Sequence, residues 1–496
     1  MKSEKIIFNH FYKLRHDIHR SYIMSPTFVD KQYEPFVNKE WISKIHPIFP
    51  MIFSFFSQPI ELQEAIKVLS DFLEISETDV ENFITPYINN KETTRSMYGN
   101  VENYFPKNIL INADLSFCGA VDYMPEQFAY EELNLEQERF IKAPATIVFM
   151  VNNTCLTDCV YCYANKLVKN KPITFEQVKE IVLEAKKLQI QKFTLDGGEF
   201  FLYKQWKELL DFLLENGFQD SLISTKVPIT EGDIVFLKKF DIPIQISLDS
   251  INPNKLTQIL DVKSDYAEKI KKTISFLDKH NVSFQVATIL TKYNDSIENL
   301  EELYDFVQNF RSLRKWEIRV GFKSMYSRGN FDEIKTSKDS VEKINQWVEE
   351  TKKSSKIYIQ WVPEVIEKYF ETEGGSKNFK GGRCSANYSN IFVLPDGKVT
   401  ICEQLYWNPR FIIGDLTTQT IEEVWNSPRA LELAFPKKEN FRNASICKKC
   451  SIFDDCYKYH NKCYVDVIKG YGDENWDFPD PRCKFAPEFI YNLNPE

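Results

Sequence analysis

Three cysteines within ten residues constrain this chain more than any other feature. Cys155, Cys159 and Cys162 have the spacing C-x3-C-x2-C and follow the apolar run 146–151. Three thiolates in one loop can hold one face of a cubane iron–sulfur cluster and leave its fourth iron open to a substrate. A structural zinc site instead needs four ligands, and no fourth Cys or His lies near this loop.

From Ala145 onward the sequence alternates between strand and helix patterns. Strands are predicted at 146–151, 192–195, 221–225, 244–248, 284–290 and 316–321. Helices are predicted at 174–188, 203–215, 234–239, 266–279, 297–310 and 340–353, the first with the capping box Thr174-x-x-Gln177. Six such units predict a parallel sheet with helices outside, either doubly wound or a partial barrel.

Chemistry in such folds gathers at the carboxyl ends of the strands. Cys155 follows the first predicted strand, and Asp196-Gly197-Gly198-Glu199 follows the second. Ser247 and Asp249 lie at the end of the fourth. The sequence therefore predicts one site that combines these residues.

These motifs resemble the radical S-adenosylmethionine enzymes, whose cysteine motif has an aromatic residue before its last cysteine, as Tyr161 does here. The resemblance implies a partial (β/α)6 barrel of the TIM type. It implies that the three cysteines hold a [4Fe–4S] cluster whose open iron binds the amino and carboxylate groups of S-adenosylmethionine. Gly197, Gly198 and Glu199 would receive the methionine amino group, and Ser247 and Asp249 would contact ribose or carboxylate. Phe200 stands where the family usually has proline.

The last quarter of the chain carries seven more cysteines, and it resembles the SPASM extension of some of these enzymes. That extension holds two auxiliary [4Fe–4S] clusters, which makes three clusters in all. By position, the first would be bound by Cys384, Cys402 and Cys463, and the second by Cys447, Cys450, Cys456 and Cys483. Six residues separate Cys456 from Cys463, where three are usual, and Tyr388, Ser389 and Asn390 occupy the place of an extra cysteine found in some relatives. The first auxiliary cluster would then keep an open iron. The alternative is a zinc ribbon of Cys447, Cys450, Cys456 and His460 or Cys463.

Residues 6–92 resemble the leader-peptide recognition element of peptide-modifying enzymes, a winged-helix-like α+β unit. Strand patterns occur at 12–24 and 27–37, and helical patterns at 41–56, 60–73 and 78–88, with His46-Pro47-Ile48 as the specific part of the likeness. In that family a leader peptide adds as a strand to a sheet edge. The alternative is a generic helical cap. Cys118, with no cysteine near it, is expected to be a buried structural thiol.

Composition excludes several other classes of protein. With 62 Lys and Arg against 71 Asp and Glu, the net charge is −9, so the electrostatic footprint of a nucleic-acid binder is missing. The start is polar, and the apolar run 48–56 is too short to span a bilayer. We expect a cytoplasmic protein with neither a nucleic-acid nor a membrane partner, whose 11 cysteines serve clusters and not disulfides.

The sequence therefore predicts five regions: a recognition-like domain at 1–92, a bridging region at 93–143, the radical barrel at 144–330, a helical bridge at 331–380 and a SPASM domain at 381–496. The implied activity is oxidative cross-linking of a ribosomal precursor peptide, through a thioether or a carbon–carbon bond, by a 5′-deoxyadenosyl radical. Its partners would be the precursor with its leader and an external one-electron reductant. No catalytic acid or base stands out; Tyr163, Glu199, Arg319 and Tyr326 are candidates by nearness to strand ends. Alternatives are a sulfatase maturase that oxidises a protein Cys or Ser, and a non-catalytic electron carrier or zinc-stabilised binding protein.

Overall fold

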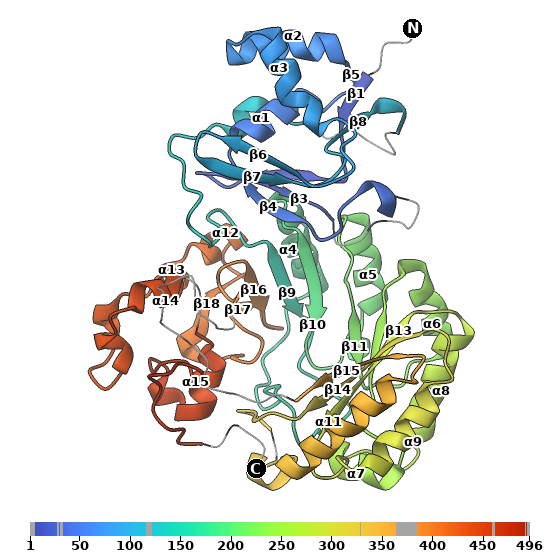
Figure 1. The fold of residues 1–496 in the computed structure, drawn as a ribbon. Coiled ribbons are helices and arrows are strands. Elements are labelled where there is room, and N and C mark those ends of the chain that lie inside the picture. Colours follow the sequence, from blue (N-terminus) through green and yellow to red (C-terminus); the bar gives the residue numbers. More distant parts are fainter. Residues whose placement is uncertain are drawn as a thin grey trace. The chain divides into compact units, whose positions relative to one another are not determined.

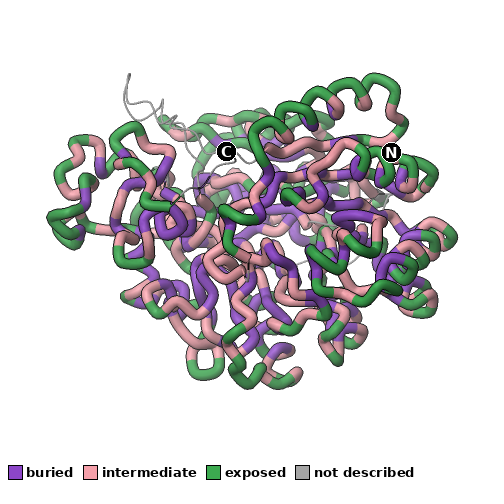
Figure 2. The backbone as a smooth tube through the Cα atoms, turned by 90° about the horizontal axis from the view of Figure 1, so that it is seen from below, coloured by how far each residue is buried: buried purple, intermediate pink, exposed green. Residues whose placement is uncertain are grey.

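The computed structural model describes residues 5–26, 29, 33–115, 122–327, 329–363, 384–458, 462–491 and 493 (Figure 1). The chain divides into two compact units. The first comprises Met1–Thr146 with Ala185–Lys192, and the second comprises Ile147–Glu184 with Phe193–Glu496. Buried, intermediate and exposed residues are interspersed along the backbone, as expected when each element turns one face toward a core (Figure 2). No helix in the described ranges is long and apolar enough to cross a membrane.

The first unit combines small antiparallel sheets with three helices. Its strands are β1 (Lys5–Phe8), β2 (Lys13–His16), β3 (Ser21–Met24), β4 (Ile42–Ile45), β5 (Ile60–Glu61), β6 (Thr94–Tyr98), β7 (Val101–Phe105) and β8 (Leu110–Asn112), and its helices are α1 (Ile48–Ser54), α2 (Leu62–Leu73) and α3 (Glu77–Ile84). The sheets have the orders β5-β1-β8 and β2-β3-β4, and β6 pairs with β7. Aromatic rings fill the core, with Phe49 4.7 Å from Phe105 and Phe53 5.4 Å from Tyr87 between centroids.

The helices predicted at 60–73 and 78–88 correspond to α2 and α3, and the Ser76 Oγ accepts a hydrogen bond from the Asp79 N–H at 3.1 Å. The helix predicted at 41–56 is wrong in its first part, where Ile42–Ile45 form β4 and pair with β3. Pro47 explains the change, because a proline disfavours helical conformation in the residue before it and suits the start of a helix. Of the predicted strand 27–37, residues 27, 28 and 30–32 lie outside the described residues, and Glu34–Phe36 form a 3-10 turn.

Residues 93–143, expected as a bridge, contain β6, β7 and β8 within the first unit. The end of this region is held by buried charged side chains from the β2–β3 hairpin. The guanidinium of Arg15 donates to the carbonyl oxygen of Pro144 at 2.9 Å, and the carboxylate of Asp17 accepts from the backbone N–H of Lys142 at 2.8 Å. Buried charges satisfied in this way fix the path of a segment that has little regular structure. Cys118 lies outside the described residues.

The second unit begins as the predicted series of strands and helices. Its strands are β9 (Thr146–Met150), β10 (Lys192–Asp196), β11 (Ile223–Thr225), β12 (Ile244–Ser247), β13 (Phe284–Leu290), β14 (Leu313–Val320) and β15 (Tyr358–Val362). Its helices are α4 (Phe175–Lys187), α5 (Trp206–Glu215), α6 (Glu231–Leu237), α7 (Pro253–Leu260), α8 (Tyr266–Lys279), α9 (Ile297–Val307), α10 (Phe331–Ile334) and α11 (Lys338–Lys352). Strands β11 to β15 form one parallel sheet in chain order. Helices α6, α8 and α9 lie along its outer side, so this part of the chain is a partial barrel (Figure 1).

The predicted capping box at the start of α4 is confirmed: the Gln177 N–H donates to the Thr174 Oγ at 3.3 Å, and the Thr174 N–H donates to the Gln177 side chain at 3.0 Å. Two elements were not predicted, α7 and β15. Strand β15 lies within residues 331–380, which were expected to form a helical bridge. Residues 364–380 of that bridge lie outside the described residues.

Between β10 and β11 a carboxylate takes the place of strand pairing. Strands β9 and β10 belong to a sheet separate from β11–β15. The buried carboxylate of Asp220 accepts from the backbone N–H of Leu195 in β10 at 2.7 Å and from that of Ser221, just before β11, at 2.7 Å. One side chain thus ties the end of β10 to the start of β11.

We expect Asp220→Ala to lower the free energy of unfolding by about 3 kcal/mol, because it leaves buried backbone N–H groups without an acceptor. The midpoint of urea unfolding measures this loss. Asp211→Ala is the matched control, since Asp211 forms an exposed ion pair with Lys239, worth about 1 kcal/mol or less. Equal midpoints for the two variants would contradict the bridging role of Asp220.

The tail adds strands to the sheet that contains β9. Its elements are β16 (Asn390–Val393), β17 (Lys398–Thr400), β18 (Ile412–Asp415), α12 (Ile421–Trp425), α13 (Pro428–Ala434), α14 (Phe453–Lys458) and α15 (Tyr464–Tyr471). The order is β10-β9-β16-β17-β18, so the tail extends the first barrel strands within one sheet. Pro395-Asp396-Gly397 form the turn that joins β16 to its antiparallel partner β17, with Gly397 at φ +87° as a tight turn requires.

Candidate active site

The cysteine loop that follows β9 is held by backbone hydrogen bonds to the end of α7. The N–H groups of Asp158 and Val160 donate to the carbonyl oxygens of Leu260 and Ile259 at 2.8 and 2.9 Å. The Ser324 hydroxyl donates to the Cys162 carbonyl at 2.7 Å. The loop is therefore fixed by the barrel even though it has no regular secondary structure.

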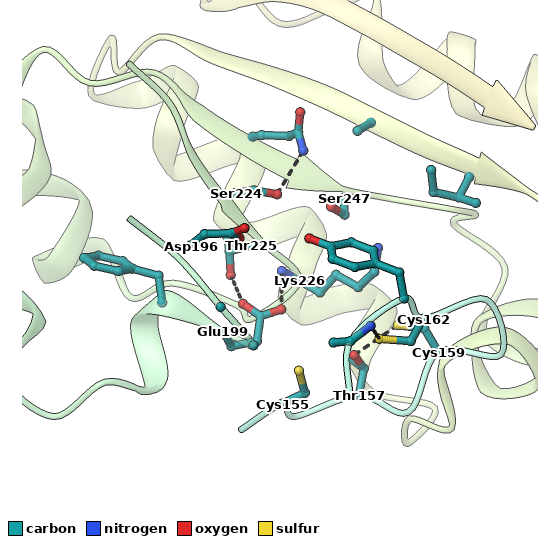
Figure 3. A pocket seen from close by; sticks show the side chains of 18 of the residues that line it. Cys155, Thr157, Cys159, Cys162, Asp196, Glu199, Ser224, Thr225, Lys226 and Ser247 are labelled. Carbon is teal, nitrogen blue, oxygen red and sulfur yellow. Dashed lines mark hydrogen bonds between the residues drawn. The ribbon is translucent and has the colours of Figure 1, made fainter. Parts of the chain in front are cut away.

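Cys155, Cys159 and Cys162 all line one cavity of about 510 Å³ (Figure 3). Each is a free thiol. Burial raises the pKa of Cys155 to about 12 and that of Cys159 to about 11. Thiols in this environment stay protonated at neutral pH unless a positive centre binds them, and metal ligation needs the thiolate.

The glycine pair after β10 lies directly against the segment that leads into the cysteine loop. The Gly198 N–H donates to the Asn152 carbonyl at 2.7 Å, and the Glu199 N–H donates to the Thr154 carbonyl at 2.9 Å. A Cβ atom on Gly198 would lie 2.3 Å from the Thr154 oxygen, and one on Gly197 would lie 2.4 Å from the Asn152 oxygen. Gly197 also has φ +131°. The pair is thus required by this close approach of two backbone segments.

Glu199 lies in the cavity wall with its carboxylate held by the end of β11. One oxygen accepts from the Thr225 hydroxyl at 2.7 Å and the other from the Lys226 N–H at 2.8 Å (Figure 3). Burial raises the pKa of this carboxyl group, and its hydrogen bonds act against the shift. A carboxylate has about four acceptor positions, so Glu199 can still accept from a ligand amine.

Ser247 lines the cavity, but Asp249 does not, because it lies behind Tyr161 and Lys226. The Tyr161 hydroxyl donates to the fully buried Asp249 carboxylate, whose other oxygen accepts from the Ile289 N–H at 2.9 Å. The Lys226 ammonium lies 3.6 Å from Asp249 and 5.5 Å from the Tyr161 ring centroid. Asp249 therefore positions a tyrosine and a lysine that face the cavity.

Three of the four acid–base candidates, Tyr163, Glu199 and Arg319, line the cavity. Tyr326 is not among the lining residues; its hydroxyl donates to the Leu405 carbonyl at 3.3 Å and its ring packs on Tyr406.

Asp196, which the sequence places at the end of the second predicted strand, lines the cavity, and so do three side chains that the sequence interpretation missed: Lys226, Glu403 and Gln404. Burial raises the pKa of Asp196 to about 7. For Lys226, burial lowers the pKa, but Asp249, Cys159 and Glu199 raise it by more. Lys226 directly follows the carboxyl end of β11, so the strand-end rule that points to Asp196 could also have found Lys226. Glu403 comes from the tail, and no local signal points to it.

The tail cysteines interact electrostatically in two groups. Burial raises the pKa of Cys402 and Cys463, and Cys384 adds to both shifts. Burial likewise raises the pKa of Cys456, and the thiols of Cys447, Cys483 and Cys450 add to this shift. Burial also raises the pKa of Cys483, with further contributions from Cys447 and Cys450. The first group contains Cys384, Cys402 and Cys463, and the second contains Cys447, Cys450, Cys456 and Cys483.

Both donor sets consist of cysteine thiolates, which are the protein ligands of [4Fe–4S] clusters. A zinc ion needs its thiolates at about 2.3 Å from one point. Among the described residues no three Cys, His, Asp or Glu side chains meet in that way. The thiolate ligands of a cluster bind separate iron atoms, so their sulfur atoms lie farther apart than those around a single zinc ion. His460, the histidine of the zinc alternative, lies outside the described residues.

Comparisons with known proteins agree with the motifs. The chain matches the radical SAM superfamily over residues 150–307 and the SPASM iron–sulfur cluster-binding domain over residues 384–451. Mycofactocin maturase MftC of Mycolicibacterium smegmatis is 21% identical over 70% of this chain and 84% of its own length. Radical SAM cyclopropyl synthase TigE of Paramaledivibacter caminithermalis is 22% identical over 80% and 81%. An uncharacterised protein of Methanocaldococcus jannaschii is 26% identical over 39%, and the chain spans only 63% of that relative.

The fold is similar to that of SuiB from Streptococcus suis. The structure of SuiB bound to precursor peptide SuiA matches with a TM-score of 0.62 at 16% identity, covering 97% of this chain and 100% of that one. SuiB bound to S-adenosylmethionine matches with a TM-score of 0.59 at 15% identity over the same shares. The cysteine loop and the glycine pair thus lie in a radical SAM domain at residues 150–307, and the cysteine-rich tail carries a SPASM iron–sulfur cluster-binding domain at residues 384–451.

Proposed function

We propose that this enzyme cross-links a ribosomally made precursor peptide oxidatively, with a 5′-deoxyadenosyl radical as the hydrogen-abstracting agent. The observation that carries the proposal is the shared cavity, in which the cysteine loop, the glycine–glutamate segment and Glu403 of the SPASM tail line one space. Its volume of about 510 Å³ lies within the range of small-molecule sites, about 300–1,000 Å³. Radical formation and oxidation of the product could therefore take place beside one another.

In this proposal the [4Fe–4S] cluster that binds S-adenosylmethionine would be held by Cys155, Cys159 and Cys162. The cluster would supply the electron for the cleavage of S-adenosylmethionine. Glu199 accepts hydrogen bonds from the methionine amino group while Thr225 and Lys226 keep its carboxylate in place. Ser247 contacts the cofactor from β12. Tyr161 and Lys226, both held by Asp249, close the cavity beside the loop and exclude water.

The two tail groups would each hold an auxiliary [4Fe–4S] cluster. A cluster bound by Cys384, Cys402 and Cys463 alone keeps an open iron that can take a substrate thiolate. This favours a thioether as the bond formed, with a carbon–carbon bond as the second candidate.

A peptide substrate is supported by the likeness to SuiB, which covers 97% of this chain and was determined with a bound precursor peptide. MftC is also named as a maturase. The first unit has edge strands β5, β2 and β4, to which an extended leader could add as a strand. A leader held there would raise the effective concentration of the core peptide at the cavity.

The ten described cysteines are free thiols, which suits the reducing cytoplasm. In that compartment an external one-electron reductant would supply the electron that each turnover consumes. Because the net charge is −9, we expect no nucleic-acid partner.

The experiment is to search the DNA beside this gene for a short, Cys-containing reading frame, to express the peptide that it encodes, and to incubate that peptide with reduced enzyme and S-adenosylmethionine. We expect the peptide to lose two hydrogen atoms in mass for each cross-link. A thioether would also remove one alkylatable thiol, whereas a carbon–carbon bond would leave the thiol count unchanged. A peptide of unchanged mass, in a reaction that cleaves S-adenosylmethionine and oxidises a folded protein instead, would contradict the proposal.

A further inference from the structure

Lys462, in the SPASM tail, has a buried ammonium group that the proposed reaction does not use. The residue is 8% exposed, and its Nζ atom has no hydrogen-bond partner among the described residues. Burying an ammonium without a partner is costly, so lysine is almost never found in such a place unless an opposite charge compensates it.

Four aromatic rings surround the ammonium. Its Nζ atom lies 4.9 Å from the centroid of Tyr464, 5.3 Å from Phe441, 5.9 Å from Trp476 and 6.0 Å from Tyr457. Cation–π attraction from these rings favours the charged form of the lysine. The rings also exclude water, so an opposite charge nearby acts on the lysine at low dielectric.

The carboxylates near Lys462 already have partners. Asp477 accepts from the Arg442 guanidinium at 3.0 Å, and Asp480 accepts from the Arg482 guanidinium at 2.7 Å. Burial lowers the pKa of Lys462, and four groups act against this shift: Cys447, Asp477, Asp480 and Cys456. Two of the four groups that favour the charged lysine are therefore cysteines assigned here as cluster ligands.

Lys462 also lies near members of both cysteine groups. It interacts electrostatically with Cys447 and Cys456 of the second group, and it lines a cavity of about 30 Å³ together with Cys384 of the first. Sites for small molecules need roughly 300 Å³ or more, so this cavity is not a site for an organic ligand. Lys462 precedes Cys463 in the stretch after Cys456 that is longer than usual for this domain.

We propose that Lys462 is the counter-cation of the auxiliary clusters, a positioning residue that raises their reduction potentials. Clusters bound by thiolates gain negative charge on reduction, and a fixed positive charge nearby stabilises the reduced form. This inference rests on the proposed binding of auxiliary clusters by the two cysteine groups.

The test compares reduction potentials in a Cys155→Ala background, where only auxiliary clusters contribute to the signal. Lys462→Met keeps the length of the side chain and removes its charge. We expect it to shift the reduction equilibrium of an auxiliary cluster at least tenfold toward the oxidised form, about 59 mV for a one-electron couple, in an EPR-monitored titration. Lys449→Met is the matched control: it removes an exposed charge next to Cys450, which solvent screens.

Lys462→Arg keeps the charge and is expected to keep the parent potentials. If Lys462→Met shifts the potentials no more than Lys449→Met does, the proposal is overturned. Loss of auxiliary iron from Lys462→Met but not from Lys462→Arg would support it, whereas loss from both would overturn it. Absence of auxiliary iron from the Cys155→Ala parent itself would overturn the cluster assignment as well, so the two failures can be told apart.

Discussion

Cys155→Ala is expected to reduce cleavage of S-adenosylmethionine to the background level while the auxiliary clusters remain. Cys155 is one of three thiols in the wall of the cavity, and the loop has no fourth cysteine or histidine to replace it. Three irons of the cluster each need a cysteine ligand, and Cys155→Ala leaves only two cysteines in the loop. Formation of 5′-deoxyadenosine under dithionite, with iron and sulfide analysis of the same anaerobic sample, measures both parts of the prediction.

The iron content should fall by one cluster, because the tail cysteines form groups separate from the loop. Cys118→Ala is the matched control, since Cys118 belongs to none of the proposed cluster groups, and it should keep both cleavage and iron. Unchanged cleavage in Cys155→Ala would mean that the cluster is held elsewhere. Loss of all iron would mean that the tail does not bind clusters independently.

Gly198→Ala is expected to have the second largest effect, because the new methyl group would meet backbone atoms that cannot move alone. Its Cβ would lie 2.3 Å from the Thr154 oxygen and 2.8 Å from the Thr154 nitrogen. To relieve the clash, the segment before Cys155 must separate from the end of β10. We expect a loss of about 3 kcal/mol in stability and loss of cleavage activity.

Gly232→Ala provides the control for this prediction. Gly232 lies in α6, and a Cβ there would meet nothing within 4 Å. Alanine in a helix is favoured over glycine by about 1 kcal/mol, so this variant should be at least as stable as the parent. Urea unfolding and 5′-deoxyadenosine formation should therefore separate the two alanine variants clearly. Full activity of Gly198→Ala would refute the structural reason given for the glycine pair.

The local pattern of the sequence predicted most of the barrel. Each of the six predicted barrel strands overlaps a strand from β9 to β14, because buried parallel strands read as short apolar runs. The capping box at Thr174 also determined where α4 begins. Patterns of this kind depend only on neighbouring residues, so one sequence is enough to find them.

What the sequence did not reveal depends on pairing over long distances. The addition of β16 to β9 brings Glu403 into the cavity wall, and no residue near position 403 indicates that pairing. Asp220 replaces backbone pairing between β10 and β11 with a side chain, which no strand pattern encodes. Asp249 was expected at the cofactor, but its contacts with Tyr161 and Lys226 become visible only once three loops are brought together.

The most direct test of the central claim is the fate of the abstracted hydrogen. The precursor peptide is made with deuterium at the carbon positions of its core residues and incubated with reduced enzyme and S-adenosylmethionine. If the radical formed in the cavity acts on the peptide, one deuterium will appear in 5′-deoxyadenosine for each cross-link formed. If 5′-deoxyadenosine stays unlabelled while the peptide is modified, the cavity does not perform the abstraction and the account is wrong.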